Sequence, residues 1–315
     1  MPLVTAYDDV PSPRVERHLP DGHLNWRTDF IQCPKDKAVD TPMAFLSEGS
    51  LGRVLRTHFH RVDQFHVICM GKGSLGRYPL AFGGVHFARA YTPYGPINHE
   101  DGLGFIALRA HRDDGAQYMH MPENRAELES VRSRVPWQCK SVPDFSIQPG
   151  ENGIAMKAID GIQDEHGLAA YSVVMKPGAT AYSIDLSKSD GQYILVMKGG
   201  LIHEGVQKNH LTVIWVEKNE GPFRLIAGPE GAELIILNFP VPGSYTRKKS
   251  GVAPSRGTEE AFKVYQCRLC AFVYDESAGH PDAGIAPGTR WVDVPETFQC
   301  PDCEARKSDF EMIEI

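Results

Sequence analysis

Residues 265–275 are Tyr-Gln-Cys-Arg-Leu-Cys-Ala-Phe-Val-Tyr-Asp, and residues 300–303 are Cys-Pro-Asp-Cys. Each segment holds two cysteines separated by two residues, and 29 residues separate Cys270 from Cys300. A Cys-x-x-Cys turn directs two thiolates at one ion, so two such turns can complete a tetrahedral four-sulfur site. The spacing therefore predicts a metal centre at Cys267, Cys270, Cys300 and Cys303. Four sulfur ligands by themselves suit iron and zinc equally.

The residues around the cysteines distinguish between the two metals. Residues 262–315 resemble a rubredoxin over nearly the whole length of that family: residues 265–275 match its opening and residues 284–289 match its central turn. The aromatic positions of its small core match Tyr265, Tyr274, Trp291, Phe298 and Phe310. The resemblance implies one iron on the four cysteines that moves single electrons. The alternative is a zinc ribbon that only staples the C-terminus.

Two positions depart from the rubredoxin pattern. That family usually has glycine directly after each Cys-x-x-Cys, in a left-handed turn, whereas this chain has Ala271 and Glu304. A non-glycine residue at positive φ costs about 1 kcal/mol, which lowers stability without removing the site. A core of about 50 residues is small, so we expect the metal to supply much of its folding free energy.

A second group of metal-type residues lies upstream. Residues 52–71 are Gly-Arg-Val-Leu-Arg-Thr-His-Phe-His-Arg-Val-Asp-Gln-Phe-His-Val-Ile-Cys-Met-Gly. Residues two apart on a strand share a face, so His58 lies with His60 and Gln64 lies with His66. Neutral imidazoles that converge inside a barrel suit iron, copper, nickel or zinc.

This spacing resembles the first motif of the cupins, Gly-x5-His-x-His-x3-Glu-x6-Gly, with Gln64 in the place of the glutamate. The second motif is weaker, because Asn98 follows Pro93 and Gly95 where the last histidine is usual. The resemblance implies a second iron, or another divalent metal, in this barrel. Its expected ligands are His58, His60, Gln64 and His99, with His66 and His86 as alternatives to His99. A barrel that has lost its metal and binds an organic ligand is the other interpretation.

The rest of the chain is dominated by short apolar or alternating runs broken by Gly, Pro and Asn, a pattern typical of β proteins. Residues 170–240 resemble a degenerate cupin half without the histidine pair, which we expect to be structural. The expected fold is mainly β: two cupin-type β-barrels (double-stranded β-helices) and a small C-terminal rubredoxin-like iron domain. The expected units are an N-terminal cupin domain (1–145), a second cupin domain (146–240), a linker (241–261) and the rubredoxin-like domain (262–315), with a helix at 123–134 as divider. Strands are expected at 53–59, 64–70, 85–91, 104–109, 170–175, 193–197, 211–216, 224–226 and 233–239.

Charge and hydropathy exclude several classes of function. A net charge of -7 argues against a nucleic-acid partner, which needs a basic face. No apolar run is long enough to cross a membrane, and the N-terminus fits no secretory signal, so we expect a cytoplasmic protein. From residue 262 onward five Lys and Arg stand against ten Asp and Glu, which gives -5 and leaves -2 for the rest. The acidic tail suits a separate rubredoxin reductase with a basic surface.

The fusion itself suggests the function, because a one-electron carrier is useful beside a second redox centre. We expect an iron-dependent oxidoreductase, a mononuclear cupin dioxygenase or monooxygenase, that acts on a small aromatic or carboxylated substrate and receives electrons from the rubredoxin. Arg53, Arg56 or Arg89 would pair with a substrate carboxylate. The sequence indicates no catalytic residue beyond the metal ligands, and the barrels could pair as a homodimer. The alternative is a non-catalytic, redox-sensing or ligand-binding bicupin with a structural metal domain.

Overall fold

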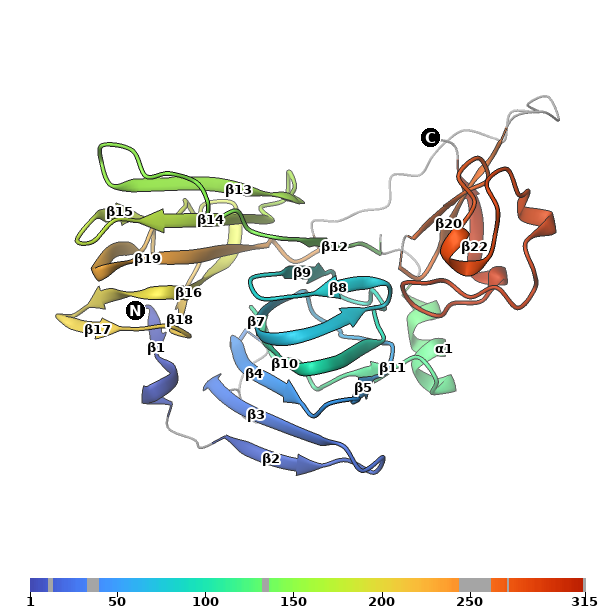
Figure 1. Ribbon diagram of the computed structural model, residues 1–315, viewed down its shortest axis with the longest axis horizontal. Coiled ribbons are helices and arrows are strands. Elements are labelled where there is room, and N and C mark those ends of the chain that lie inside the picture. The colour runs from blue at the N-terminus through green and yellow to red at the C-terminus, as the bar shows by residue number, and fades with distance from the viewer. Residues whose placement is uncertain (11–13, 33–39, 132–135, 244–261, 271, 314–315) are drawn as a thin grey trace.

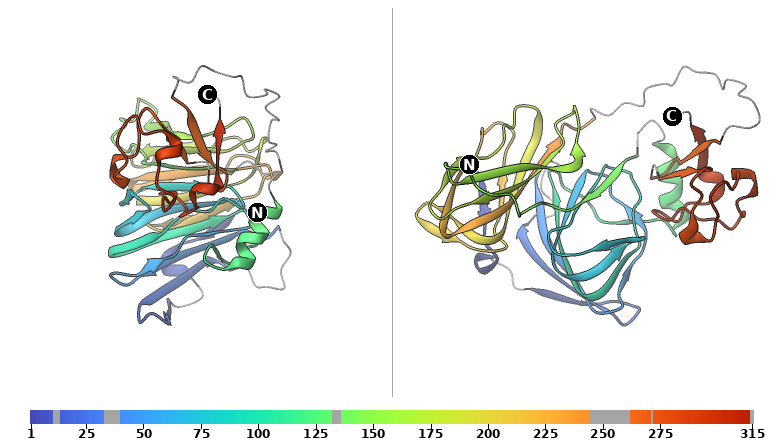
Figure 2. Two further views of the ribbon diagram at one scale, coloured as in Figure 1. Left: turned by 90° about the vertical axis from the view of Figure 1, so that its right-hand side faces the viewer. Right: turned by 45° about the horizontal axis from the view of Figure 1, so that its top comes forward.

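The computed structural model describes residues 1–10, 14–32, 40–131, 136–243, 262–270 and 272–313. Two β-barrels lie side by side, and a small C-terminal domain lies against the far side of the first barrel (Figure 1). The view in the right-hand panel of Figure 2 separates the three units. In the part of the chain that is described, no helix is long and apolar enough to span a bilayer.

The first barrel is built from a nine-stranded sheet of described residues in the order β12-β9-β7-β10-β4-β3-β2, with β5 on β10 and β8 on β7. Its strands are β2 (Val15–His18), β3 (Leu24–Ile31), β4 (Met43–Gly49), β5 (Val54–Leu55), β7 (Gln64–Leu75), β8 (Tyr78–Leu80), β9 (Val85–Ala88), β10 (Ile97–Arg109) and β12 (Gln138–Ser141). The expected strand at 53–59 is divided into β5 and a separate β6 (His58–Phe59). β6 pairs with β11 (Gln117–Tyr118) as a two-stranded sheet.

The two faces of β7 serve different purposes, because side chains alternate along a strand. Gln64, His66 and Ile68 face the interior of the barrel, whereas Phe65 and Val67 join a core on its outer face. The same alternation holds along β10, where inward residues alternate with the outward Ile106 and Leu108. The interior of the first barrel therefore holds polar groups beside apolar residues such as Ile68 and Phe105, while the outward residues named here are apolar.

The second barrel is built from an eight-stranded sheet of described residues in the order β1-β18-β16-β19-β14-β13, with β15 on β19 and β17 on β16. Its strands are β1 (Leu3–Thr5), β13 (Ile154–Gln163), β14 (Ala169–Met175), β15 (Thr180–Tyr182), β16 (Ser189–His203), β17 (Val206–Lys208), β18 (Val213–Val216) and β19 (Arg224–Pro240). The two expected strands at 224–226 and 233–239 are one continuous strand. β1 pairs with β18, so the first strand of the chain lies in the sheet of the second barrel.

The interior of the second barrel is filled with aliphatic side chains. Val173, Ile194, Ile214, Leu234 and Ile236, among others, form one buried cluster there. Aliphatic side chains thus take the place that histidine and arginine side chains occupy in the first barrel.

The two barrels share a core. Phe65, Phe87 and Leu108 of the first barrel pack with Trp215 and Phe239 of the second in one cluster. The hydroxyl of Tyr193 in the second barrel donates to the carbonyl oxygens of Met43 and Arg109 in the first, each at 3.0 Å. Because apolar burial is the main stabilising term, this shared core holds the two barrels together.

A helix and the C-terminal domain complete the chain. α1 (Pro122–Ser130) begins one residue before the start of the expected helix and ends four residues before its expected end. Residues 132–135 lie outside the described part. The C-terminal domain has a three-stranded sheet of described residues in the order β21-β20-β22. Its elements are β20 (Val264–Cys267), β21 (Val273–Asp275), β22 (Phe310–Ile313) and the 3-10 turns η2 (Pro281–Ala283), η3 (Trp291–Asp293) and η4 (Lys307–Asp309); η1 (Tyr7–Asp9) lies near the N-terminus. Most of the expected linker, residues 244–261, lies outside the described residues.

Candidate metal centre and the adjoining histidine cavity

The four cysteines converge as the sequence predicts. The sulfur atoms of Cys267, Cys270, Cys300 and Cys303 all lie within 4.8 Å of one another, and all four residues are buried. The Cys267 and Cys303 sulfurs are 3.7 Å apart, and the Cys270 and Cys300 sulfurs are 3.4 Å apart. Among the described residues this is the one cluster of three or more His, Cys, Asp or Glu ligand atoms as compact as a metal requires.

The backbone around the cysteines shows the strain expected from the missing glycine. Glu304 has φ of 57°, in the left-handed region, and its N–H donates to the carbonyl oxygen of Cys300 at 2.8 Å. This prediction is confirmed at Glu304, while Ala271 lies outside the described residues.

The cysteine centre needs a cation. Burial raises the pKa of Cys270, Cys300 and Cys303, whereas hydrogen bonds from the other cysteines lower the pKa of Cys267. Several thiolates at this separation repel one another strongly in a buried site. A metal ion offsets that repulsion, so metal binding and folding of the domain are coupled.

The cysteine loops pack against the first barrel in a single apolar cluster, here called the docking cluster. Its barrel side consists of Phe59, Met119 and Leu128, from β6, the segment after β11, and α1. Its C-terminal side consists of Leu269, Ala305 and the four cysteines. The metal centre therefore faces the barrel.

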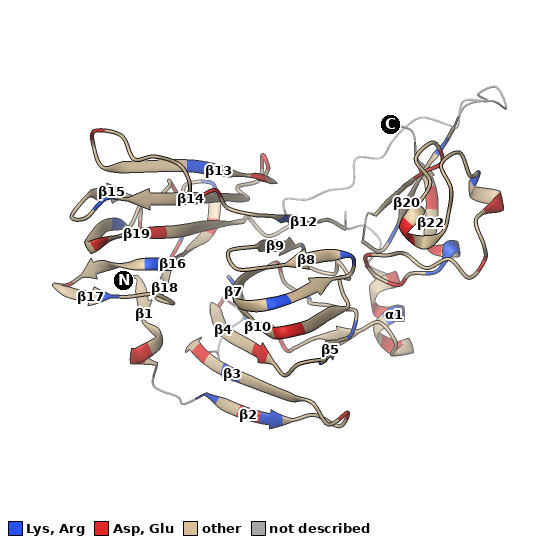
Figure 3. Cartoon of the chain, in the orientation of Figure 1, with Lys and Arg blue, Asp and Glu red and all other residues tan. Residues whose placement is uncertain are grey.

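Charged groups around the docking cluster are complementary, with the cation on the barrel side. Arg125 of α1 pairs with Asp309 at 3.1 Å, and Lys140 of β12 pairs with Asp302 at 3.6 Å. Arg77 lies 3.3 Å from the Nε2 of His280. Acidic residues of the C-terminal domain are visible in Figure 3. Two acidic residues of the C-terminal domain, Asp302 and Asp309, thus pair with the first barrel and are not available to a separate reductase.

The first barrel contains a cavity of about 430 Å³, whose lining includes residues of β2, β3, β4 and the segment after β10. It is lined by Arg17, Asn25, Arg27, Met43, Phe45, Ser47, Leu55, His58, His60, His66, Tyr94, Phe105, Ala107, Arg109, Asp113, Asp114, Gly115, Ala116 and Tyr118. His58 and His60 belong to this lining, whereas Phe59 between them points into the docking cluster. β6 therefore separates the cavity from the four-cysteine centre.

His58 and His60 each have one ring nitrogen fixed by an acceptor. The Nδ1 of His58 donates to the carbonyl oxygen of Arg56 at 2.7 Å, and the Nδ1 of His60 donates to Asp113 at 2.7 Å. Burial, and next the nearness of His60, lowers the pKa of His58 to about 3. Burial, and next the charge of Arg109, lowers the pKa of His60 to about 4. Both rings are therefore neutral near pH 7, and each has an Nε2 lone pair, as metal-bound histidines do.

Gln64 is engaged by Arg109. Its Oε1 accepts a hydrogen bond from the Nη2 of Arg109 at 2.9 Å, and its amide nitrogen donates to the Tyr94 hydroxyl. The same Nη2 lies 3.2 Å from the Nε2 of His60. Arg109 is fully buried, and although burial opposes ionisation of Asp113, contact with His60 and Arg109 lowers the pKa of Asp113 to about 2.

His99 lies apart from the cavity. Its Nδ1 donates to the carbonyl oxygen of Arg53 at 3.1 Å, and its Nε2 lies 3.4 Å from an Nη of the same arginine. A Cβ on Gly49 would lie 2.2 Å from the His99 ring, so the ring packs directly on that glycine. Both ring nitrogens are thus already occupied.

The four residues expected to hold a metal in this barrel are therefore only partly assembled. His58 and His60 face one cavity, and the Nε2 of His58 fits a metal, whereas the Nε2 of His60 accepts a hydrogen bond from the Nη2 of Arg109 at 3.2 Å. Gln64 is hydrogen-bonded to Arg109 and His99 contacts Arg53, so neither side chain is placed to bind a metal. His66 also lines the cavity, and His86 lies behind it on β9.

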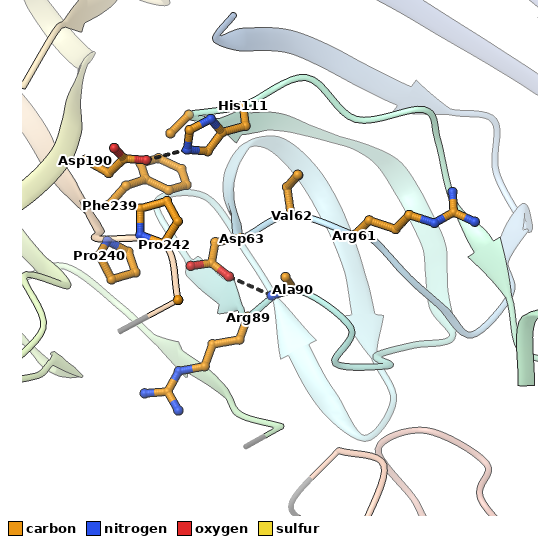
Figure 4. A pocket seen from close by; sticks show the side chains of 12 residues that line it. Arg61, Val62, Asp63, Arg89, Ala90, His111, Asp190, Phe239, Pro240 and Pro242 are labelled. Atoms are coloured by element: carbon orange, nitrogen blue, oxygen red, sulfur yellow. Dashed lines mark hydrogen bonds and ion pairs between the residues drawn. The ribbon is translucent and has the colours of Figure 1, made fainter. Parts of the chain in front are cut away.

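None of the three arginines expected to bind a substrate carboxylate lines this cavity. Arg53 contacts His99, and Arg56 lines a separate hollow with His120 and Glu304 at the border of the C-terminal domain. Arg89 lines a cavity of about 190 Å³ between the barrels and pairs with Asp164 at 3.5 Å. Figure 4 shows this inter-barrel cavity, where His111 of the first barrel is hydrogen-bonded to Asp190 of the second.

Two cavity residues, Arg109 and Asp113, were not expected from the sequence. Arg109 ends an expected strand, and strand alternation places it on the face of Phe105 and Ala107, so its inward position could have been found. Asp113 reaches His60 from a loop 53 residues away in the sequence, a contact that no local pattern indicates.

Comparison with known proteins identifies the family of the C-terminal domain. The rubredoxin family model matches residues 264–310. Rubredoxin 4 of Rhodococcus sp. (strain Q15) is 59% identical over 54 residues, which are 17% of this chain and 90% of that protein. The rubredoxin of Acinetobacter baylyi is 57% identical over 53 residues, 17% of this chain and 98% of that protein.

The barrels resemble a solved structure from Nostoc punctiforme, described as a candidate dioxygenase, with a TM-score of 0.52. The likeness has 11% identity and covers 81% of this chain and 87% of that chain, so it shows the fold alone. Together with the four buried cysteines, the match at residues 264–310 accounts for an iron held by four thiolates. The chain belongs to the rubredoxin family through its C-terminal domain, which is fused behind two cupin-type barrels.

Proposed function

We propose that this chain is an iron-dependent oxidoreductase, an oxygenase that binds a small carboxylated or aromatic substrate in the first-barrel cavity and exchanges electrons with its own rubredoxin domain. The observation that carries the proposal is the position of β6. Phe59 packs in the docking cluster with the four cysteines, while its neighbours His58 and His60 line the cavity. Two adjacent residues thus connect the redox centre to the candidate substrate site through one short strand.

The cavity supplies a buried cation for an acidic substrate. Arg109 is fully buried, and its nearest carboxylate is that of Asp113, at 3.9 Å. A guanidinium in a site of low polarity binds a carboxylate by strong charge-assisted hydrogen bonds. Arg109 rather than Arg53, Arg56 or Arg89 is therefore the proposed carboxylate-binding residue.

His58 and His60 are the residues that would hold a second iron, or another divalent metal, through their Nε2 atoms. Such a metal, when bound, supplies a coordination site for dioxygen or substrate. Asp113 and the carbonyl of Arg56 fix the two rings, because each accepts the Nδ1 proton. The exposed carboxylates of Asp282, Asp293 and Glu296 would bind a separate reductase with a basic surface.

The contact between Arg109, Gln64 and His60 favours a second candidate function. A permanent cation within 3.2 Å of the His60 Nε2 opposes a metal ion there, as expected of a barrel that binds an organic anion without turnover. In that case the rubredoxin domain would report on, or stabilise, the liganded state.

The number of irons per chain separates the two functions. We expect purified full-length protein to contain two irons, and His58→Ala or His60→Ala to contain one, with the visible absorption of the ferric four-sulfur site unchanged. His210→Ala in the second barrel is the control and should keep both irons. A wild-type chain with a single iron, unaffected by His58→Ala, would support the ligand-binding protein instead.

A further inference from the structure

His66 and His86, which the sequence suggested only as alternatives to His99, form a buried pair inside the first barrel. His66 on β7 and His86 on β9 are register partners, and they are 4% and 2% exposed. Their Nδ1 atoms are 3.3 Å apart, so one ring must donate to the other. The direction of that hydrogen bond decides which nitrogen of His66 carries the proton.

Gln138 on β12 sets the direction. Its Oε1 lies 3.1 Å from the Nε2 of His86. Its amide nitrogen donates to the carbonyl oxygen of Pro93 at 3.4 Å, so the opposite orientation of the amide would place two oxygens against each other. The Oε1 of Gln138 can only accept, and His86 must therefore donate from Nε2.

The proton positions follow along the pair. A neutral His86 with its proton on Nε2 has a lone pair on Nδ1, so it accepts from the Nδ1 of His66. His66 then has its own lone pair on Nε2. In this arrangement of hydrogen bonds each ring carries a single proton and is neutral.

The Nε2 atom of His66 is available to a ligand. Within the described residues no protein group is hydrogen-bonded to it, and the ring lines the cavity that also contains Arg109. Because the ring lines the cavity, a ligand or a water there can satisfy this acceptor.

We propose that His66 is a specificity-determining residue that presents only a hydrogen-bond acceptor to the cavity, and that His86 and Gln138 are the positioning residues that fix this state. The cavity therefore selects a ligand that carries a hydroxyl or N–H donor in addition to its carboxylate. This inference deepens the proposed function and rests on it in one respect, that the cavity is the substrate site.

The proton positions can be measured without any ligand. Full-length protein with ring-15N-labelled histidine, and zinc in the four-cysteine site to avoid paramagnetism, is examined by long-range 15N–1H NMR at pH 7. We expect His66 as the Nδ1–H tautomer and His86 as the Nε2–H tautomer, with Gln138→Leu mixing the tautomers of both rings. Gln117→Leu, which changes another half-buried glutamine of the same barrel, should leave them unchanged. His66 found with its proton on Nε2 in the wild type would overturn the proposal.

Ligand binding tests the consequence for selectivity. Benzoate and its three monohydroxy isomers are titrated into the full chain by calorimetry. One hydrogen bond corresponds to about a threefold to tenfold gain, so we expect at least one hydroxy isomer to bind that much more tightly than benzoate. In Gln138→Leu this preference should disappear while the affinity for benzoate stays within about twofold. The proposal would be refuted if Gln138→Leu still binds a hydroxy isomer more tightly than benzoate, or if the wild type binds all four acids equally. If none of the four acids binds, the carboxylate part of the proposed function fails, whereas the NMR result still decides the proton positions.

Discussion

Replacing His99 with glutamine should weaken the dependence of stability on pH between pH 7 and pH 5. His99 is 1% exposed, and its two ring nitrogens contact the carbonyl oxygen and the guanidinium of Arg53. Because a guanidinium only donates, the Nε2 of His99 must have a lone pair, and a proton there would point at a cation. Burial, followed by the charge of Arg53, lowers the pKa of His99 to about 4.

The size of the effect follows from proton linkage. In the unfolded chain a histidine has a pKa of about 6.5, so as pH falls the unfolded state binds a proton that the folded state refuses. The stabilisation is present above that pKa and is lost as pH falls below it. From pH 7 to pH 5 the loss is about 1.8 kcal/mol for one such histidine. Glutamine at this position keeps a donor and an acceptor but does not titrate.

The assay is denaturant unfolding of the full chain at pH 7 and pH 5, followed by tryptophan fluorescence and by hydrogen exchange of β10. The wild type should lose about 1.8 kcal/mol more than His99→Gln between the two pH values. Equal losses, within about 0.5 kcal/mol, would show that His99 is protonated freely in the folded state, and the hydrogen-bond assignment to Arg53 would then be wrong.

Three further predictions concern the C-terminal domain. A Cβ on Gly76 would lie 2.8 Å from the carbonyl oxygen of Pro301, so Gly76→Ala should weaken docking of the C-terminal domain and raise hydrogen exchange in α1. Gly102 has the same φ of 54° and nothing within 4 Å of its Cβ position, so Gly102→Ala is the matched control and should leave hydrogen exchange in α1 unchanged. Glu304→Gly should stabilise the domain by about 1 kcal/mol, seen as a higher temperature for loss of the ferric visible band, and an unchanged temperature would argue against strain at this residue. Removal of iron by a chelator under reducing conditions should unfold β20–β22 while β7 and β10 stay protected from exchange; persistence of the small sheet without metal would contradict the coupling of folding to binding.

Several features of this protein can be predicted from short-range sequence patterns. Four cysteines in two Cys-x-x-Cys turns specify their own convergence, because each turn fixes two thiolates and the aromatic residues between them build the small core. Strand alternation likewise places His58 with His60 and Gln64 with His66. The docking of the two modules has no such local signal, since Phe59, Leu128 and Leu269 come from distant segments and are individually ordinary apolar residues.

The sequence by itself determined the iron-type cysteine site, the mainly β architecture and the histidine pair, because all three depend on short-range spacing along the chain. Only the tertiary structure decided that Arg109 occupies the space beside His60 and Gln64, that His99 is turned to Arg53, and that the four cysteines lie behind Phe59. The physical reason is the closure of the barrel. A cavity is formed by side chains from strands and loops up to about a hundred residues apart, and which of them meet is set by sheet register and packing rather than by any neighbour in the sequence.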